Sequence, residues 1–313
     1  MYKILDKQVL SKNAKMMVVE AQLVAQKARA GQFLIVRVDE YGERIPLTIA
    51  DSDAAAGSVT LIFQEVGKST KHMGRLEIGE ALTNVVGPLG VPTEIAPYGK
   101  VVVVAGGIGI APIYPIVHSL KEAGNTIIAI IGARTKELLF WEDRIQSCSD
   151  QLIICTDDGS YGRKGFVTQA LKELLESDKG IARAWAIGPA IMMKMVAETT
   201  RPYQLPTVVS LNTIMIDGTG MCGGCRVELD QGWKFACVDG PEFDGHQVHW
   251  ESVLERLKYY QAEEHLSTQY WESHSCQLEP LLEETQKHEP QNDHSRQNPH
   301  GCAATTGAHP QLQ

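Results

Sequence analysis

The fold class of this chain is predicted by the segment Val101-Val102-Val103-Val104-Ala105-Gly106-Gly107-Ile108-Gly109-Ile110-Ala111-Pro112. Five consecutive apolar residues predict a strand that is buried on both faces, as in a parallel sheet. The glycines allow a sharp turn and a close approach of the backbone to a ligand, and Pro112 suits the first turn of a helix. A strand, a glycine turn and a helix in this order are typical of a nucleotide-binding α/β domain.

Four residues of this loop are candidate contacts for the pyrophosphate of a dinucleotide: Gly106, Gly107, Gly109 and Pro112. The position of the third glycine in the G-x-G-x-x-G fingerprint holds Pro112, so the loop alone is weak evidence. Its place between a buried strand and a helix over residues 111–123 is what favours nucleotide binding.

More strands are predicted by apolar runs at residues 126–131, 152–156, 184–187 and 207–216. Their alternation with helical segments indicates a parallel sheet covered on both faces. Asp157, Asp158 and Gly188 follow two of these strands at the carboxyl ends, where open α/β sheets bind ligands. The two aspartates could equally cap the turn that follows, and both interpretations stay open.

Residues 1–97 have a different rhythm, with short apolar runs separated by Gly and Pro, which predicts a small antiparallel barrel. Two segments stand out in it, Arg44-Ile45-Pro46-Leu47-Thr48 and Val66-Gly67-Lys68-Ser69-Thr70. The second is not a Walker loop, because Ile62 stands where that motif requires glycine. Gly67, Ser69 and Thr70 could still donate hydrogen bonds to a diphosphate, with Arg44 as a bidentate partner. Taken alone, the two segments read as a turn and a surface charge.

A third motif lies near the C-terminal third, with the spacing Asp217-x4-Cys222-x2-Cys225-x11-Cys237. This is the plant-type [2Fe–2S] spacing, C-x4-C-x2-C with a distant fourth cysteine, except that a carboxylate replaces the first thiolate. Glycines fill the loop, as expected where backbone amides approach cluster sulfurs. The alternative is a zinc site made of the three cysteines and His246. It gives no reason for the glycines.

Composition narrows the class of protein. A formal charge of −9 argues against a nucleic-acid surface. The segment 101–120 is uncharged but contains glycines and prolines, so it is not expected to span a membrane. The remaining cysteines are expected to be free thiols in a reducing compartment: Cys148, Cys155, Cys276 and Cys302. Together with an N-terminus that lacks a signal-peptide pattern, these features predict a soluble cytoplasmic protein.

The predicted organisation has four parts: a barrel (1–97), an α/β domain (98–208), a cluster module with a helix (209–262), and a polar, disordered tail (263–313). The helix is expected from Trp250 to Glu264, because Val253, Leu254, Leu257 and Tyr260 share one face. That face could dock a partner or pack within the chain.

The order of these motifs resembles a family of FAD- and [2Fe–2S]-carrying electron-transfer subunits. They occur in NADH-dependent reduced ferredoxin:NADP+ oxidoreductase, in sulfide dehydrogenase and in type B dihydroorotate dehydrogenase. The resemblance covers about residues 1–260. It implies a ferredoxin-reductase-like fold, an oxidoreductase activity, and a larger glutamate-synthase-like flavoprotein subunit as partner. Ferredoxin would be reached through the complex.

The resemblance also implies roles for individual residues. FAD would contact Arg44, Pro46, Leu47, Thr48, Gly67, Ser69 and Thr70. NAD(H) would approach Gly107, Gly109, Pro112, Asp157, Asp158 and Gly188. The cluster ligands would be Asp217, Cys222, Cys225 and Cys237.

Two positions discriminate within the family. Within the family that this chain resembles, dihydroorotate dehydrogenase subunits carry Cys as the first cluster ligand, whereas the ferredoxin:NADP+ oxidoreductase type carries Asp. Asp217 therefore favours the second type. Many ferredoxin-reductase relatives have Cys before the Gly-Pro turn, whereas this chain has Ile187. Asp157 and Asp158 would disfavour a 2′-phosphate, although Arg134 could hold one, so NAD(H) is expected. The alternatives are a dihydroorotate dehydrogenase subunit and a zinc-stabilised nucleotide-binding regulator.

Overall fold

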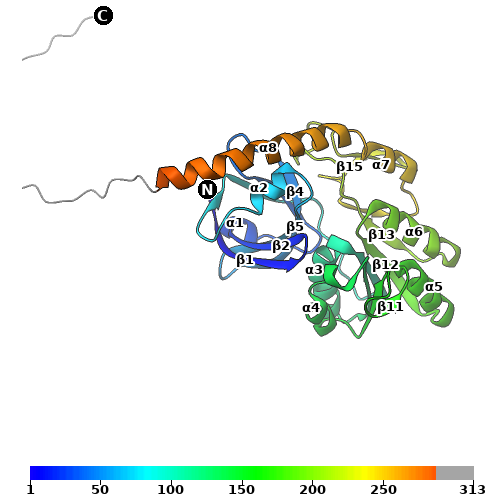
Figure 1. Ribbon diagram of the computed structural model, residues 1–313. Helices are drawn as coiled ribbons and strands as arrows, with labels where there is room; N and C mark the ends of the chain where they lie inside the picture. Colours follow the sequence, from blue (N-terminus) through cyan, green and yellow to red (C-terminus); the bar gives the residue numbers. More distant parts are fainter. Residues whose placement is uncertain (287–313) are drawn as a thin grey trace, which may run out of the picture. The chain divides into compact units, whose positions relative to one another are not determined.

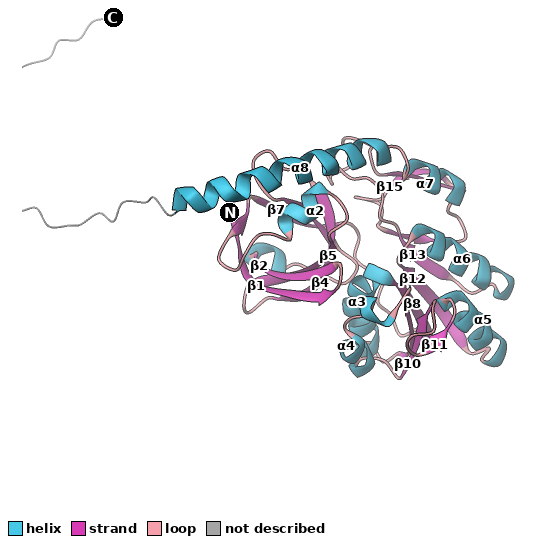
Figure 2. Cartoon of the chain, viewed as in Figure 1, coloured by secondary structure: helices cyan, strands magenta, loops and turns pink. Residues whose placement is uncertain are grey.

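The computed structural model describes residues 1–286 of the chain. Its contacts divide the chain into two units, Met1–Thr268 and Gln269–Gln313. All predicted site residues lie in the first unit, which Figures 1 and 2 show as a barrel, an α/β layer and a small C-terminal module. None of the helices in residues 1–286 combines the length and the apolar character needed to cross a membrane.

The barrel is a seven-stranded antiparallel sheet with the order β6-β1-β2-β5-β4-β3-β7. The two strands at the ends of this order, β6 and β7, are separated in the sequence by Thr83 alone. The sheet therefore nearly closes on itself. Alternate residues of β2 and β5, such as Met17, Val19, Leu61 and Phe63, fill the interior with at most 1% exposure. The strands are β1 (Tyr2–Ser11), β2 (Ala14–Glu20), β3 (Phe33–Arg37), β4 (Ile45–Asp53), β5 (Ser58–Gln64), β6 (Ala81–Leu82) and β7 (Asn84–Leu89). The short helices are α1 (Gln22–Ala25) and α2 (Lys68–Met73).

The second layer is a seven-stranded sheet with the order β11-β10-β9-β8-β12-β13-β16, parallel except for β16. Its strands are β8 (Lys100–Gly106), β9 (Thr126–Ala133), β10 (Gln151–Thr156), β11 (Arg163–Lys164), β12 (Ile181–Ile187), β13 (Thr207–Ser210) and β16 (Glu242–Asp244). Its helices are α3 (Ile110–Glu122), α4 (Glu142–Ser147), α5 (Val167–Ser177) and α6 (Ala190–Thr200). Three 3-10 turns complete it: η1 (Gly107–Gly109), η2 (Lys136–Leu138) and η3 (Arg201–Tyr203).

The four valines of β8 are buried on both faces of the parallel sheet. Val101 and Val103 belong to the core under α3, whereas Val102 and Val104 belong to the core under α5 and α6, and all four are fully buried. Each such side chain contributes about 1.5 to 3 kcal/mol relative to an exposed one. The predicted barrel and parallel α/β architecture is therefore confirmed.

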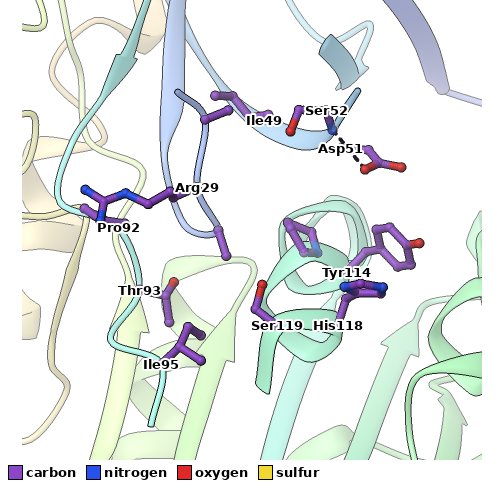
Figure 3. A pocket seen from close by; sticks show the side chains of 13 residues that line it. Arg29, Ile49, Asp51, Ser52, Pro92, Thr93, Ile95, Tyr114, His118 and Ser119 are labelled. Atoms are coloured by element: carbon purple, nitrogen blue, oxygen red, sulfur yellow. Dashed lines mark hydrogen bonds between the residues drawn. The ribbon is translucent and has the colours of Figure 1, made fainter. Parts of the chain in front are cut away.

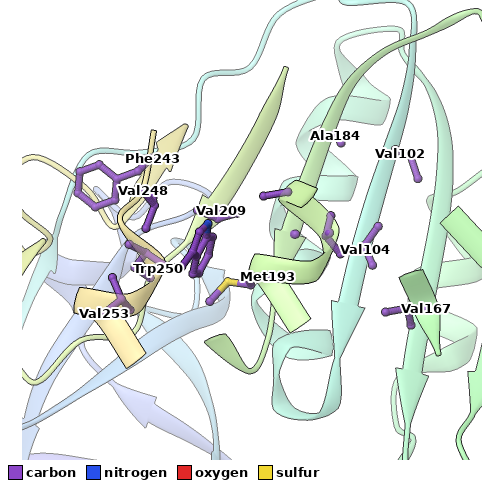
Figure 4. Packing of buried hydrophobic residues seen from close by; sticks show 14 of the residues in the cluster. Val102, Val104, Val167, Ala184, Met193, Val209, Phe243, Val248, Trp250 and Val253 are labelled. Carbon is purple, nitrogen blue, oxygen red and sulfur yellow. The ribbon is translucent and has the colours of Figure 1, made fainter. Parts of the chain in front are cut away.

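The C-terminal module contains β14 (Arg226–Leu229), β15 (Gly232–Phe235), α7 (Trp250–Arg256) and α8 (Gln261–Gln286). It shares a core with the α/β layer, because Trp250 and Val253 of α7 belong to the same buried cluster as Met193 of α6 (Figure 4). Strand β16 also joins the larger sheet, with Phe243 opposite Val209. Of the predicted face, Val253 and Leu257 pack in this core, whereas Tyr260 lies beyond α7 and is 53% exposed.

Three expectations need correction. The strand predicted over residues 207–216 ends at Ser210, because the next amide, that of Leu211, bonds to the carbonyl of Pro241 outside the ladder. The single helix predicted over 250–264 is two helices. The expected disordered tail from residue 263 is helical as far as Gln286, in a segment rich in the helix formers Glu, Gln and Leu. The rest of that tail lies outside the described residues.

Candidate functional site

The glycine loop after β8 packs backbone to backbone against the loop after β12. A Cβ on Gly109 would lie 2.2 Å from the Ile187 carbonyl oxygen, and one on Gly188 would lie 2.9 Å from the Gly106 carbonyl oxygen. Gly107 has φ +56°, a conformation that favours glycine. The structure therefore brings these glycines together at the carboxyl edge of the sheet, where Pro112 lies in the first turn of α3.

Asp157 and Asp158 follow β10, two strands away from the glycine loop in the order β10-β9-β8. The Asp158 carboxylate accepts a hydrogen bond from the Ser160 amide at 2.9 Å. Hydrogen bonds from Ser160 lower the pKa of Asp158. Asp158 thus caps the turn, as the alternative interpretation held, whereas the exposed Asp157 has no such role in the turn.

The two barrel motifs lie side by side. Pro46, Leu47 and Thr48 are in β4, and Gly67 is the N-cap of α2. The Ser69 hydroxyl donates to the Glu43 carboxylate at 2.7 Å, which joins α2 to the start of β4.

The Thr70 hydroxyl is occupied in its own turn. It donates to the Gly67 carbonyl at 3.1 Å and accepts from the Gly67 amide at 3.2 Å. A role in binding a diphosphate would have to replace these local bonds.

Asp217 organises the loop that contains the predicted cluster ligands. Its carboxylate accepts hydrogen bonds from the amides of Thr219 (3.0 Å), Met221 (3.1 Å) and Cys222 (3.0 Å). These bonds, led by the Thr219 amide, lower the pKa of Asp217 to about 2. The carboxylate is therefore a fixed anionic oxygen donor, and the Cys222 sulfur lies 3.4 Å from its Oδ1.

Cys225 and Cys237 form a second pair, both at most 2% exposed. The Cys237 amide donates to the Cys225 sulfur at 3.4 Å. Burial, and then the neighbouring Cys225, raise the pKa of the Cys237 thiol. The Gly224 amide donates to the Cys222 sulfur at 3.4 Å, as expected for a loop whose amides bond to cluster sulfurs.

The predicted cluster ligands therefore lie in two pairs, Asp217 with Cys222 and Cys225 with Cys237. Among residues 1–273, whose side chains are described, no three His, Cys, Asp or Glu side chains gather so as to hold one metal ion. Each iron of a [2Fe–2S] cluster needs two protein ligands, whereas one zinc ion needs four. His246, the fourth ligand of the zinc alternative, has its Nε2 3.0 Å from the Thr200 hydroxyl. The donor set fits the two-iron cluster.

The cluster loop lies directly against the barrel. A Cβ on Gly218 would lie 2.8 Å from Leu89 Cδ1 and 2.9 Å from Ile35 Cγ1. Arg44 donates from Nη2 to the Asp217 carbonyl at 3.2 Å. The barrel motif and the first predicted cluster ligand are therefore adjacent. Sequence reasoning missed this contact, since nothing in either motif points to the other.

A separate cavity of about 570 Å³ lies between the barrel and α3. It is lined among others by Ser52 at the end of β4, Thr93 in the connecting segment, and Tyr114 and His118 of α3 (Figure 3). None of the predicted flavin, nucleotide or cluster residues lines it. Beside it, Arg144 bonds to Asp51 at 2.7 Å and ties the barrel to the α/β layer.

Comparisons with known proteins agree with this geometry. Residues 212–249 match the iron–sulfur cluster binding domain of dihydroorotate dehydrogenase B, and residues 103–198 match the oxidoreductase NAD-binding domain. A Thermotoga maritima protein, named as a homologue of the dihydroorotate dehydrogenase B (NAD(+)) electron transfer subunit, is 49% identical over 244 residues. That match covers 78% of this chain and 86% of the relative. The corresponding electron transfer subunit of Desulforamulus reducens is 33% identical, covering 80% of this chain and 97% of that protein.

Solved structures give the same result. A chain of the NADH-dependent reduced ferredoxin-NADP oxidoreductase, studied for flavin-based electron bifurcation, has a TM-score of 0.82 and 44% identity. The match covers 87% of this chain and 98% of that one. A ferredoxin NADP+ reductase from Neisseria gonorrhoeae with bound FAD and NADP shares the fold, with a TM-score of 0.53, 17% identity, and coverage of 64% and 90%.

FAD stays a prediction for this chain, although the fold is shared with a reductase that binds FAD, while the expected NAD-binding and iron–sulfur cluster binding domains are confirmed. So is the expectation of an electron-transfer oxidoreductase that works with a partner subunit. This chain belongs to the family of dihydroorotate dehydrogenase B electron-transfer subunits and their homologues, with a ferredoxin-reductase-like fold.

Proposed function

We propose that this chain transfers electrons between NAD(H) and a glutamate-synthase-like flavoprotein subunit, in a cytoplasmic complex of the ferredoxin:NADP+ oxidoreductase or sulfide dehydrogenase type. The choice of this type over the dihydroorotate dehydrogenase type rests on one observation. The carboxylate of Asp217 stands at the first ligand position, 3.4 Å from the Cys222 sulfur. The 44% identity to the ferredoxin-NADP oxidoreductase chain supports the same type.

When bound, NADH supplies a hydride, FAD accepts two electrons and releases them singly, and the cluster carries one electron at a time. The chain's own residues supply binding and orientation. The open space beside Gly107 leaves room for a pyrophosphate at the start of α3, whereas Gly109 lets this loop pack against the backbone of Ile187. Ile187 places no thiol beside the nicotinamide, so hydride transfer depends on stacking and alignment.

The contacts proposed for the cofactors are those named by the motifs. FAD is assigned to Arg44, Pro46, Leu47, Thr48, Gly67, Ser69 and Thr70. NAD(H) is assigned to Gly106, Gly107, Gly109, Pro112, Asp157, Asp158 and Gly188. The cluster is assigned to Asp217, Cys222, Cys225 and Cys237. The adjacency of Arg44 and Asp217 supports an arrangement in which flavin and cluster are close.

A second candidate is the electron-transfer subunit of dihydroorotate dehydrogenase B, which the names of several relatives favour. The two functions predict different partners. Purification of the native complex, followed by mass spectrometry of the co-purifying subunit, separates them. A glutamate-synthase-like flavoprotein supports the proposal, and a dihydroorotate dehydrogenase subunit overturns it in favour of the second candidate.

A further inference from the structure

Three arginine side chains donate hydrogen bonds to backbone carbonyls of the loop that runs from residue 217 to residue 225. They come from three different parts of the fold: the segment before β4, the first residue of β14, and the last residue of α7. The bonds are Arg44 Nη2 to Asp217 O at 3.2 Å, Arg226 Nη1 to Gly223 O at 3.2 Å, and Arg256 Nη2 to Gly224 O at 2.8 Å.

These guanidinium groups bond to carbonyls rather than to carboxylates. Among residues 1–273, whose side chains the structure describes, none of the three forms an ion pair with a carboxylate, although the whole chain carries a net charge of −9. Their hydrogen bonds all go to neutral carbonyls of one loop. Three positive charges are thus concentrated around the proposed cluster.

Arg256 is the best anchored of the three. Its bond to Gly224 is the shortest and is partly buried. Its helix is fixed in the core by Trp250 and Val253, which are 5% and 4% exposed (Figure 4). The guanidinium also lies 5.5 Å from the Tyr259 ring centroid. Arg226 and Arg256 line the same small void beside Gly224, so both approach the loop from this void.

An oxidised [2Fe–2S] cluster with four anionic ligands has a net charge of −2, since two ferric ions and two sulfides contribute +6 and −4. Adding one electron makes this charge −3. A nearby cation stabilises the reduced form more than the oxidised form, and so raises the reduction potential. The effect is strongest for a partly buried cation, because solvent screens it less.

We propose that Arg256, assisted by Arg226, is a positioning residue that holds the cluster loop and raises the potential of the cluster. This inference rests on the proposed cluster ligands. On this proposal, α7 is the element of the C-terminal module that affects the reduction potential of the cluster, because it carries Arg256. Arg44 is left out of the test, because it is also assigned to the flavin.

The test compares full-length Arg256→Gln, Arg226→Gln and Arg256→Lys with the wild-type protein, all purified anaerobically. Arg201→Gln is the matched control, because Arg201 donates to the His246 carbonyl at 2.8 Å, outside the cluster loop. Two quantities are measured: the cluster midpoint potential by EPR-monitored redox titration, and the rate of iron release to a chelator.

Arg256→Gln should lower the equilibrium constant for cluster reduction about tenfold, which is about 59 mV for one electron. It should also release iron several-fold faster. Arg226→Gln should show smaller changes of the same sign, and Arg201→Gln should show none. Arg256→Lys should keep most of the potential while releasing iron faster, because the charge is kept and the planar hydrogen-bonding group is lost.

A wild-type midpoint and wild-type iron release in Arg256→Gln would overturn the inference, and so would an equal shift in Arg201→Gln. If Arg256→Gln cannot retain its cluster while Arg201→Gln can, the positioning role is supported, and the potentials of Arg226→Gln and Arg256→Lys decide the effect of charge. A wild-type protein without a [2Fe–2S] EPR signal would instead refute the proposed function itself.

Discussion

At the scale of single residues, the site depends on groups whose neighbours leave them little freedom. The carboxylate of Asp217 is fixed by three amides of its own loop, which keep it ionised. Gly109 has no room for a side chain against Ile187. Asp217 sets the chemistry of a proposed cluster ligand, and Gly109 sets the distance between the loops after β8 and β12.

Replacing Asp217 by Cys should keep the cluster but change its visible spectrum and midpoint potential, because thiolate is softer and more covalent than carboxylate. Asp230→Cys is the control, since Asp230 lies in the same module but pairs with His249 at 3.0 Å. Absorption and EPR spectra of both variants provide the comparison. A wild-type spectrum for Asp217→Cys would show that Asp217 is not a ligand.

Gly109→Ala should separate the loops after β8 and β12, because its Cβ would lie 2.2 Å from a backbone oxygen. We expect a loss of about 1 to 3 kcal/mol in the free energy of unfolding, together with weaker NADH binding. Gly180→Ala is the control, since the nearest atom to its Cβ is a side-chain oxygen of Asp178 at 3.2 Å. Urea unfolding and NADH titration measure both effects. Equal behaviour of the two variants would contradict the close approach.

At the scale of elements, β16 joins the C-terminal module to the α/β sheet, and Glu242 on this strand accepts a hydrogen bond from Thr93 at 2.6 Å. Thr93 belongs to the segment that connects the barrel to β8. One carboxyl group therefore links three parts of the molecule. Burial is the main cause that raises the pKa of Glu242 from 4.5 to about 7, while Thr93 and Arg183 oppose the shift.

This shift predicts a pH dependence of stability. Folding raises the pKa of Glu242. Between pH 4.5 and about 7, Glu242 therefore keeps its proton in the native protein, whereas it has lost this proton in the unfolded chain. The stabilisation is fully present below pH 4.5 and is lost as the pH rises through about 7, by at most about 3 kcal/mol. Glu242→Gln should lack this loss and be the more stable protein at pH 8. Urea unfolding at pH 5 and pH 8 tests it, and parallel pH profiles would contradict it.

What the sequence could predict follows from local signals. The valines of β8 and the glycines after it predict a buried strand and a nucleotide loop without reference to any distant residue, and the spacing from Asp217 to Cys237 predicts a cluster loop. The contacts of Glu242 with Thr93 and of Arg44 with Asp217 join residues 149 and 173 positions apart, and neither leaves a pattern in its own segment. The polar composition of α8 favours disorder in a sequence analysis, although most of its residues have a high helix propensity.

At the scale of the whole molecule, the barrel, the α/β layer and the cluster loop form one unit, Met1–Thr268. The cluster loop contacts the barrel through Gly218, and the α/β layer through the shared core around Trp250. The proposed flavin motif and the proposed cluster loop are adjacent through the bond from Arg44 to the Asp217 carbonyl.

NADH should be oxidised faster than NADPH when an artificial acceptor is supplied, because the exposed carboxylate of Asp157 disfavours a 2′-phosphate near the ribose. Steady-state rates with both nucleotides measure the preference, and Arg134→Ala serves as the control for a phosphate contact. A clear preference for NADPH that Arg134→Ala abolishes would contradict the assignment of NAD(H).

Visible absorption of the anaerobically purified protein, before and after adding NADH, tests whether this chain carries flavin and a two-iron cluster that NADH reduces. We expect flavin bands on a broad iron–sulfur absorption, both bleached by NADH. A colourless protein containing stoichiometric zinc would contradict it.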